Sequence, residues 1–193
     1  EPAGLVSVEG EREYLLAWEK ARGGVTLARI DALSGALLQE LALADSSDGA
    51  GPGPALAYDP LRRQLLGVWR NAEGGVAGAI LKREGESLVV RRRLSVTSRG
   101  GSNRLAVSFS PGRAKFLVVW EQVLSEGGVE ILGQQVDSRT LLRKGSPGFR
   151  ITGTGAEDRP GFRACSPDLL ALPSGEGFLL VWDANDANRP EAG

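Results

Sequence analysis

An acidic residue directly follows three of the four tryptophans in this chain. These acids are Glu19, Glu121 and Asp183, and Arg70 stands at the fourth such position. Two carboxyl groups held about 5 to 9 Å apart can hydrolyse a glycosidic bond. A residue type repeated at equivalent positions is more naturally structural, because catalysis needs different roles in different places. We therefore favour solvated charges at loop edges over a catalytic pair, and we predict no catalytic residue.

An oxygen-rich group near the end of the sequence could hold a calcium ion. It contains Asp183, Asn185, Asp186 and Asn188. It lacks the glycine and the bidentate glutamate of an EF-hand loop, so an ordinary turn is the favoured interpretation and no metal site is predicted. The glycine pairs at 100–101 and 153–155 have neither a following lysine nor a helix start, which argues against a phosphate site. No cofactor is expected.

Two absences exclude whole classes of chemistry. The chain has no histidine, which removes Ser-His-Asp and Cys-His catalysis and the commonest transition-metal ligand. Its single cysteine, Cys165, allows neither an internal disulfide nor a cysteine-based zinc site. From this we expect a protein that is not an enzyme.

The charge balance bears on partners. The net charge is −1, so no general attraction to nucleic acid is expected, and the basic triplet at 91–93 is interpreted as a solvated strand. No apolar run approaches the roughly 20 residues that cross a bilayer, so membrane insertion is not predicted. Because the chain starts at Glu1 and has no methionine, we expect a processed product or an excised segment without a targeting peptide.

The tryptophans also mark an internal repeat. Trp18, Trp69, Trp120 and Trp182 are separated by 51, 51 and 62 residues. After the first three comes a polar loop and then the motif GGV, at 23–25, 74–76 and 127–129. Ahead of each tryptophan lies another short apolar segment. A repeated order of several features at a near-constant period predicts a repeat architecture.

Each repeat contains segments for four short strands, with the tryptophan in the second. Residues 36–44 are rich in Ala, Leu, Gln and Glu, which favours a helix by propensity, but their position in the repeat predicts a strand. Units of about 50 residues bury their faces by stacking around an axis, which is the β-propeller solution. We therefore predict an all-β, propeller-like array of four-stranded antiparallel blades, with a β-sandwich as the alternative. The four tryptophans are expected to form its structural core.

The predicted array forms one domain over residues 1–193. Three blades are expected at about 3–48, 54–99 and 104–153, and a partial blade at 167–193. The sequence thus holds about three and a half blades. The open fourth blade predicts strand donation from a longer parent chain or from a neighbouring molecule.

The segments FLVVWEQ (116–122) and GGVEILGQQVD (127–137) resemble the "LVVWE…GQ.VD" repeats of large secreted or cell-surface bacterial proteins. The first two repeats depart from that pattern, with LARID at 27–31 and GAILK at 78–82. The resemblance implies propeller-like repeats, a scaffold role and an extracellular or cell-surface setting. It implies no catalytic residue.

Loops after the tryptophan strands and between blades are expected to share one face, which is the predicted interaction face. Its residues are Glu157, Asp158, Arg159, Phe162, Arg163, Glu121, Arg70 and Glu19. The leading hypothesis is a non-catalytic extracellular scaffold that contacts another protein, a glycan or copies of itself. The alternatives are a propeller-type carbohydrate-active enzyme that uses carboxylates, and a self-assembling filament subunit completed by strand donation.

Overall fold

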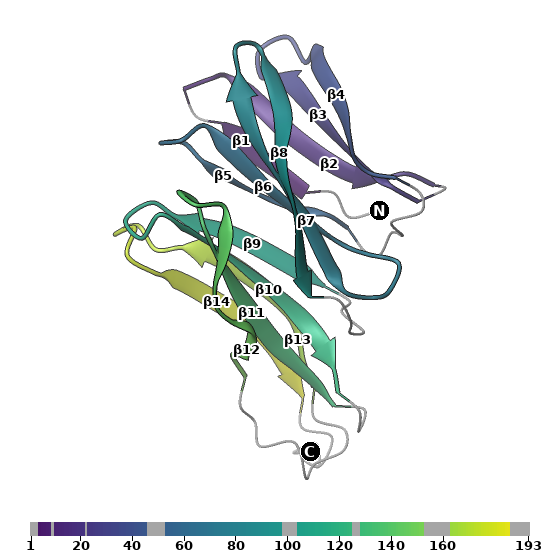
Figure 1. Cartoon of the computed structure of the whole chain (residues 1–193), viewed down its shortest axis with the longest axis vertical. Helices are drawn as coiled ribbons and strands as arrows, with labels where there is room; N and C mark the ends of the chain where they lie inside the picture. Colours follow the sequence, from purple (N-terminus) through teal and green to yellow (C-terminus); the bar gives the residue numbers. More distant parts are fainter. Residues whose placement is uncertain are drawn as a thin grey trace, which may run out of the picture.

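The computed structural model describes residues 4–8, 10–21, 23–45, 53–97, 104–124, 128–152 and 163–185, without the side chains of Pro147 and Asn185. The described residues form fourteen β-strands (Figure 1). Among them no helix is long and apolar enough to cross a membrane. The fold is all-β and propeller-like, as the repeat predicts.

Three sheets each contain four consecutive antiparallel strands, in chain order. The first sheet consists of β1 (Gly4–Val8), β2 (Glu13–Glu19), β3 (Val25–Asp31) and β4 (Leu37–Ala44). The second consists of β5 (Ala55–Asp59), β6 (Gln64–Arg70), β7 (Val76–Glu84) and β8 (Ser87–Thr97). The third consists of β9 (Leu105–Ser110), β10 (Lys115–Val123), β11 (Val129–Asp137) and β12 (Leu142–Arg150).

The fourth unit is a two-stranded hairpin of β13 (Arg163–Ala171) and β14 (Phe178–Asn185). A single parallel pair, Val129 with Arg163, joins it to the third sheet. The hairpin therefore supplies the first two strands of a fourth blade. Together with the three complete sheets, it gives the predicted three and a half blades.

The tight turns between strands are set by aspartates at strand ends. The Asp31 carboxylate accepts the backbone N–H groups of Leu33 and Ser34, at 3.1 and 2.7 Å. Asp137 occupies the equivalent turn and accepts the N–H groups of the residues two and three positions later, each at 2.9 Å. Such side-chain bonds stabilise a turn locally, which explains why these strands end where the sequence places aspartate.

The segment predicted as a strand against its helical propensity is a strand. β4 covers Leu37–Ala44 and pairs with β3, with Ala28 opposite Glu40. Pairing with a neighbouring strand and partial burial outweigh a propensity difference of a few tenths of a kcal/mol per residue. Position within the repeat was the better guide.

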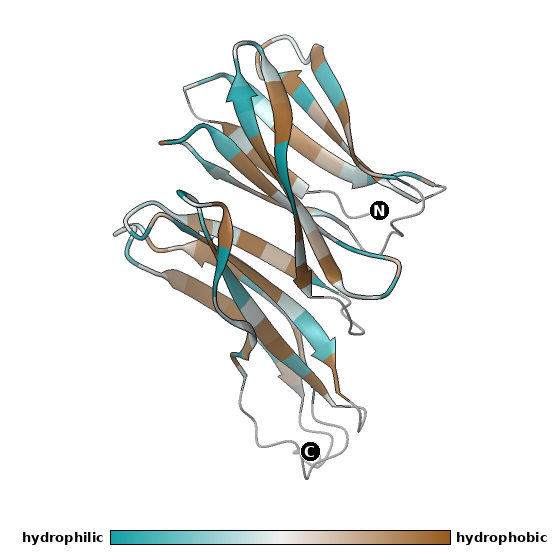
Figure 2. Ribbon diagram, in the orientation of Figure 1, coloured by the Kyte–Doolittle hydropathy of each residue, from teal (hydrophilic) through white to brown (hydrophobic). Residues whose placement is uncertain are grey.

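The core consists of three apolar layers, each between successive units (Figure 2). Trp69 is 3% exposed and packs in the layer between the first and second sheets. Trp120 is 1% exposed and packs between the second and third. In both blades the tryptophan therefore faces the preceding blade, where its large apolar area is removed from water.

The two outer tryptophans do not share this burial. Trp18 is half-buried and alternates along β2 with Leu15 and Ala17, which face the second sheet, so its side chain lies on the opposite face. Trp182 is 44% exposed, which corrects the prediction that it belongs to the core. A Cβ atom at Gly148 of β12 would lie 3.4 Å from the Trp120 ring, so the outer strands help to enclose that tryptophan. The fourth unit has no such strands among the described residues, which leaves Trp182 open.

A buried ion-pair network joins the first two sheets. The Glu13 carboxylate accepts hydrogen bonds from Arg29 at 2.7 and 3.0 Å and from Arg83 at 2.8 and 3.0 Å. Glu11 adds a second carboxylate 2.7 Å from Arg83. Burial alone would raise the pKa of Glu13, but the bonds from Arg29 and Arg83 lower it below its ordinary value. The network therefore keeps Glu13 ionised between two blades.

Candidate functional site: the axial pocket

The strand register brings several chain segments to one end of each blade. Gly4 at the start of β1 lies opposite Ala17 near the end of β2. Val25 at the start of β3 lies opposite both Glu19 and Ala44. In this sheet the first and third strands therefore begin, and the second and fourth strands end, at one shared face.

The innermost strands of successive units lie against one another. β1 contacts β5, β5 contacts β9, and β9 contacts β13. A Cβ atom at Gly4 would lie 2.6 Å from the backbone oxygen of Pro54, so only glycine permits the close approach of β1 to β5 at that point. This succession of first strands lines the axis about which the blades are arranged.

A pocket of about 480 Å³ opens on this axis, at the shared face. It is lined by the beginnings of β1, β5 and β9 and by the middle of β13: Gly4 and Leu5, then Gly53 to Leu56, then Arg104 to Val107, then Pro167 to Leu169. The volume lies within the usual range of about 300 to 1,000 Å³ for small-molecule sites. The pocket is therefore large enough for a small organic ligand.

The lining of this axial pocket combines apolar surface with one acid and one base. Leu5 is 63% exposed and Leu105 is half-buried, while Arg104 and Asp168 are exposed. The Asp168 carboxylate accepts the backbone N–H of Leu169 at 2.8 Å, which fixes its orientation in the middle of β13. The wall of the pocket therefore offers both polar and apolar surface to a small ligand.

Asp168 differs from the residues at the equivalent positions of the other blades. The residue opposite the position before the tryptophan is Gly4 in the first blade, Ala55 in the second and Ala106 in the third. In the fourth blade that residue is Asp168, opposite Val181. A carboxylate that replaces a small apolar residue in only one blade is a functional signal rather than a repeat requirement.

Arg104 shows a similar departure, because the same alignment places Gly53 in the second blade and Ser166 in the fourth at its position. Sequence inspection missed both residues, since it compared the positions after the tryptophans instead. Aligning the innermost strands by their cross-strand partners, rather than by apolar pattern, would have found them.

Glu121 was predicted on the interaction face, but it is buried, with 5% exposure. Its carboxylate accepts the backbone N–H of Ser166 at 2.7 Å. Ser166 has φ of 54°, a left-handed conformation that costs a non-glycine residue energy. Glu121 therefore holds the start of the fourth unit against the third blade, because the strained backbone needs a fixed acceptor.

The other predicted residues do not form a cluster. Glu19 and Arg70 are half-buried, and Asp183 and Arg163 are exposed. None of these four lines the axial pocket. Glu157, Asp158, Arg159, Phe162, Asp186 and Asn188 lie outside the described residues, as does the side chain of Asn185. In the described ranges no three acidic, histidine or cysteine side chains are grouped as metal ligands would be.

No family model matches this chain, and no curated protein matches it. Several solved structures resemble its fold. AofleA from Arthrobotrys oligospora matches with a TM-score of 0.58 and 8% identity, over 87% of this chain and 45% of that one. A bifunctional GH43-CE protein of Bacteroides eggerthii matches with a TM-score of 0.54 and 12% identity, over 93% and 22%.

A thermostable family-43 glycoside hydrolase matches with a TM-score of 0.51 and 14% identity, over 95% of this chain and 63% of that one. This chain spans less than two thirds of each of the three matched chains. At such identities the likeness shows the shared fold.

The comparison corrects one expectation. The absence of histidine led us to expect a protein that is not an enzyme, whereas its structural neighbours include glycoside hydrolases. The reasoning was wrong because glycoside hydrolysis uses carboxyl groups and needs no histidine. The absence of histidine therefore does not exclude this chemistry.

Proposed function

We propose that this chain is a propeller module of a carbohydrate-active protein, and that its axial pocket binds a sugar residue. The observation that carries the proposal is Asp168, the one carboxylate among the described pocket residues, at a position where the other blades have glycine or alanine. The likeness to two glycoside hydrolases of the same fold adds support.

The pocket residues have distinct roles in this proposal. Leu5 and Leu105 pack against the nonpolar face of a sugar ring, since C–H groups of sugars favour apolar surfaces. Arg104 donates hydrogen bonds to ring hydroxyls, and Asp168 accepts them. In a complete hydrolytic site Asp168 would be one of the two carboxyl groups that the reaction uses.

The test is a panel of neutral oligosaccharides, with binding measured by calorimetry and hydrolysis measured by release of reducing ends. Asp168→Asn keeps the shape of the side chain and its bond to Leu169 but removes the charge. We expect it to weaken sugar binding about tenfold or more, as for a lost charge-assisted hydrogen bond, and to abolish any turnover. Asp183→Asn is the matched control, because Asp183 is exposed and does not line the pocket.

Equal losses in both variants would contradict the role of Asp168. Failure of the whole panel to bind at millimolar concentration would contradict carbohydrate recognition at this pocket.

A second function, association through strand addition, is favoured by the edge of β14. The equivalent strands β2, β6 and β10 each pair on both sides, whereas β14 pairs with β13 alone in the part of the chain that the structure describes. Leu179 is 48% exposed and Val181 is 54% exposed. An apolar strand with an open edge accepts a further strand. We propose that an added strand takes the position that β11 holds in the third blade.

Changing Val181 to lysine tests this second proposal. A charge on the open edge should reduce self-association or strand capture, measured by analytical ultracentrifugation, while leaving the melting temperature within a few degrees. A wild-type chain that is monomeric at all concentrations, with protected β14 amides in hydrogen exchange, would contradict it. For the carbohydrate function we also propose an extracellular setting, which a secretion signal in the parent gene would support.

A further inference from the structure

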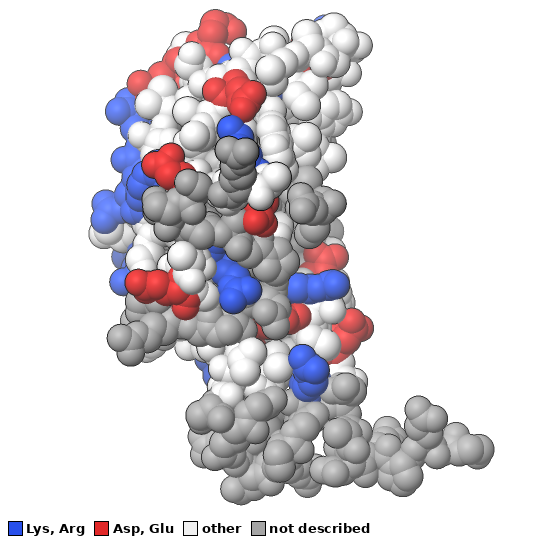
Figure 3. All heavy atoms as spheres, turned by 90° about the vertical axis from the view of Figure 1, so that its right-hand side faces the viewer, with Lys and Arg blue, Asp and Glu red and all other residues white. Residues whose placement is uncertain are grey.

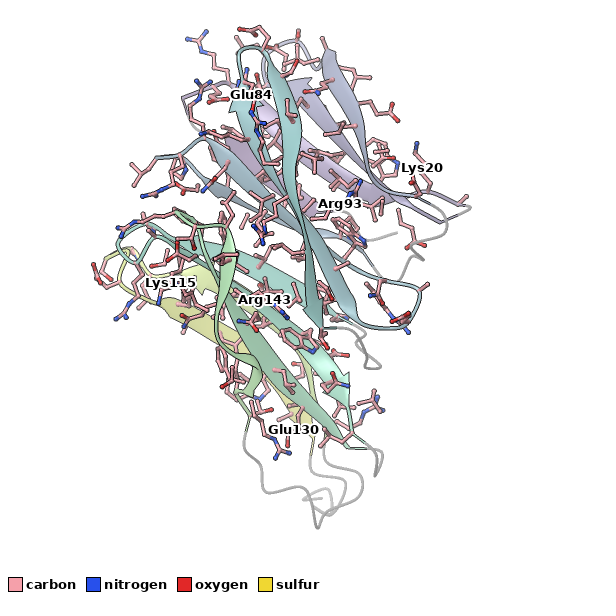
Figure 4. All side chains as sticks on the ribbon, in the orientation of Figure 1. Lys20, Glu84, Arg93, Lys115, Glu130 and Arg143 are labelled. Carbon is pink, nitrogen blue, oxygen red and sulfur yellow. The ribbon has the colours of Figure 1, made fainter. Side chains whose placement is uncertain are left out.

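A second hollow lies far from the axis, between the outermost strands of the second and third blades. It has a volume of about 450 Å³ and is bordered by β8 and β12. Its lining includes Arg92, Arg93 and Arg143, together with Leu94, Leu142 and Gln134. Figure 4 labels Arg93 on β8 and Arg143 on β12, the strands on its two sides. We call this hollow the interblade groove.

The bulged course of the outer strands opens the groove. The register of β11 with β12 shifts between Gly133 and Gln135, and Gly145 has φ of 79°. Gln134 is 0% exposed, and its amide donates to the Lys144 carbonyl at 2.8 Å and accepts from Gly148 at 3.3 Å. Because Gln134 is satisfied by backbone groups, it holds the bulge in place, and the groove is a built feature of the fold.

The three arginines of the groove differ in how far they are already engaged. Arg93 donates to the Leu43 carbonyl of the first sheet. Arg143 donates one bond of 3.2 Å to the Val96 carbonyl, which leaves its other N–H groups available. The Arg92 side chain is exposed and makes no hydrogen bond or ion pair with any described residue. At least one guanidinium group and part of another can therefore bind a ligand.

The charged residues that line the groove are all arginines. No carboxylate is among its lining residues. The carboxylate of Glu84 pairs with Arg91, the residue before Arg92 on β8, and so does not neutralise the arginines of the groove. Figure 3 shows Lys and Arg side chains gathered along one edge of the molecule, at the left of that view. Unpaired guanidinium groups in a concave site favour an anionic ligand, because the fork of N–H donors matches an oxyanion.

The apolar part of the lining restricts the class of ligand further. Leu142 is 45% exposed, and Leu94 is half-buried beside it. A free inorganic anion gains nothing from these leucines, whereas a sugar ring that carries an anionic group can pack its nonpolar face on them. The groove therefore combines the two contacts that an acidic sugar needs.

We propose that the interblade groove binds the anionic group of an acidic glycan, a carboxylate or a sulfate ester, through Arg92 and Arg143. The ring that carries this group lies against Leu94 and Leu142. This site is separate from the axial pocket, and the proposal does not depend on a sugar binding there.

The test compares three oligosaccharides of equal length by calorimetry: an oligogalacturonate, a sulfated oligogalactan and a neutral oligogalactan. We expect the two anionic ligands to bind and the neutral one to bind at least tenfold more weakly. The stronger of the two anionic ligands identifies the group as carboxylate or sulfate. Arg92→Gln should weaken anionic binding about tenfold, as for a lost charge-assisted hydrogen bond.

Arg139→Gln is the matched control, because Arg139 is exposed and does not line the groove. This substitution changes the net charge by the same amount as Arg92→Gln. Arg143→Gln is a second variant, made with a melting curve because Arg143 also contacts the second sheet. Equal weakening by Arg92→Gln and Arg139→Gln would show only general charge attraction and would overturn the proposal. So would equal affinity for the neutral and acidic ligands, or no binding of either acidic ligand at millimolar concentration.

Discussion

Replacing Trp120 and Trp182 by alanine, one at a time, compares two equivalent positions with different surroundings. A fully buried tryptophan removes about 200 Å² from water, which is about 5 kcal/mol at about 25 cal/mol per Å². Trp120 is 1% exposed and should approach that value, within the range of about 3 to 5 kcal/mol for such core changes. Trp182 is 44% exposed, so its side chain buries roughly half of that area, and its replacement by alanine should cost about 2 to 3 kcal/mol.

The assay is urea unfolding followed by circular dichroism, with the free energy of unfolding compared at equal m-values. We expect Trp120→Ala to cost about 2 kcal/mol more than Trp182→Ala. Trp69→Ala, at a residue 3% exposed, is the control and should resemble Trp120→Ala. A loss below about 1 kcal/mol for Trp120 would place that ring at the surface and refute the packing of each tryptophan against the preceding blade.

Glu13→Gln should destabilise the chain by about 3 kcal/mol, because it leaves the buried guanidinium groups of Arg29 and Arg83 without their shared carboxylate, and thermal unfolding measures this. Glu13 also predicts a pH dependence. Its pKa in the folded chain lies below the ordinary 4.5, so its contribution is present above pH 4.5 and is lost as the pH falls through the folded pKa. Urea unfolding between pH 3 and 7 should show this loss in the wild type and a smaller one in Glu13→Gln. Glu121→Gln should cost about 1.5 to 3 kcal/mol through its weakened bond to Ser166, and unchanged hydrogen exchange at Ser166 would contradict that role.

The repeat made most of the fold predictable. The spacing of the tryptophans and the GGV motifs located the strands, and position within the repeat correctly placed a strand at 36–44. Both patterns are local and recur along the chain, so the strands assigned in one repeat can be checked against those of another. The burial of Trp182 was predicted wrongly, because the described part of the fourth unit has no outer strands to cover this side chain.

The candidate site was less predictable, because it depends on contacts between blades. Asp168 and Arg104 lie together at the axis only once four innermost strands are brought side by side. Glu121 looked like a loop-edge charge, yet it accepts a backbone N–H 45 residues away in sequence. The interblade groove arises from an irregular pairing of β11 with β12 that no sequence pattern indicated.

Mapping a bound sugar by NMR tests the central claim of carbohydrate recognition at the axial pocket most directly. The neutral oligosaccharide that binds best in the panel is titrated into the isotope-labelled chain, and backbone amide shifts are followed. The account predicts the largest shifts at the pocket-lining residues of the innermost strands, at Leu5, Ala55, Leu105 and Leu169, with saturation removed by Asp168→Asn. Shifts confined to other surfaces, or binding that is unaffected by Asp168→Asn, would contradict it.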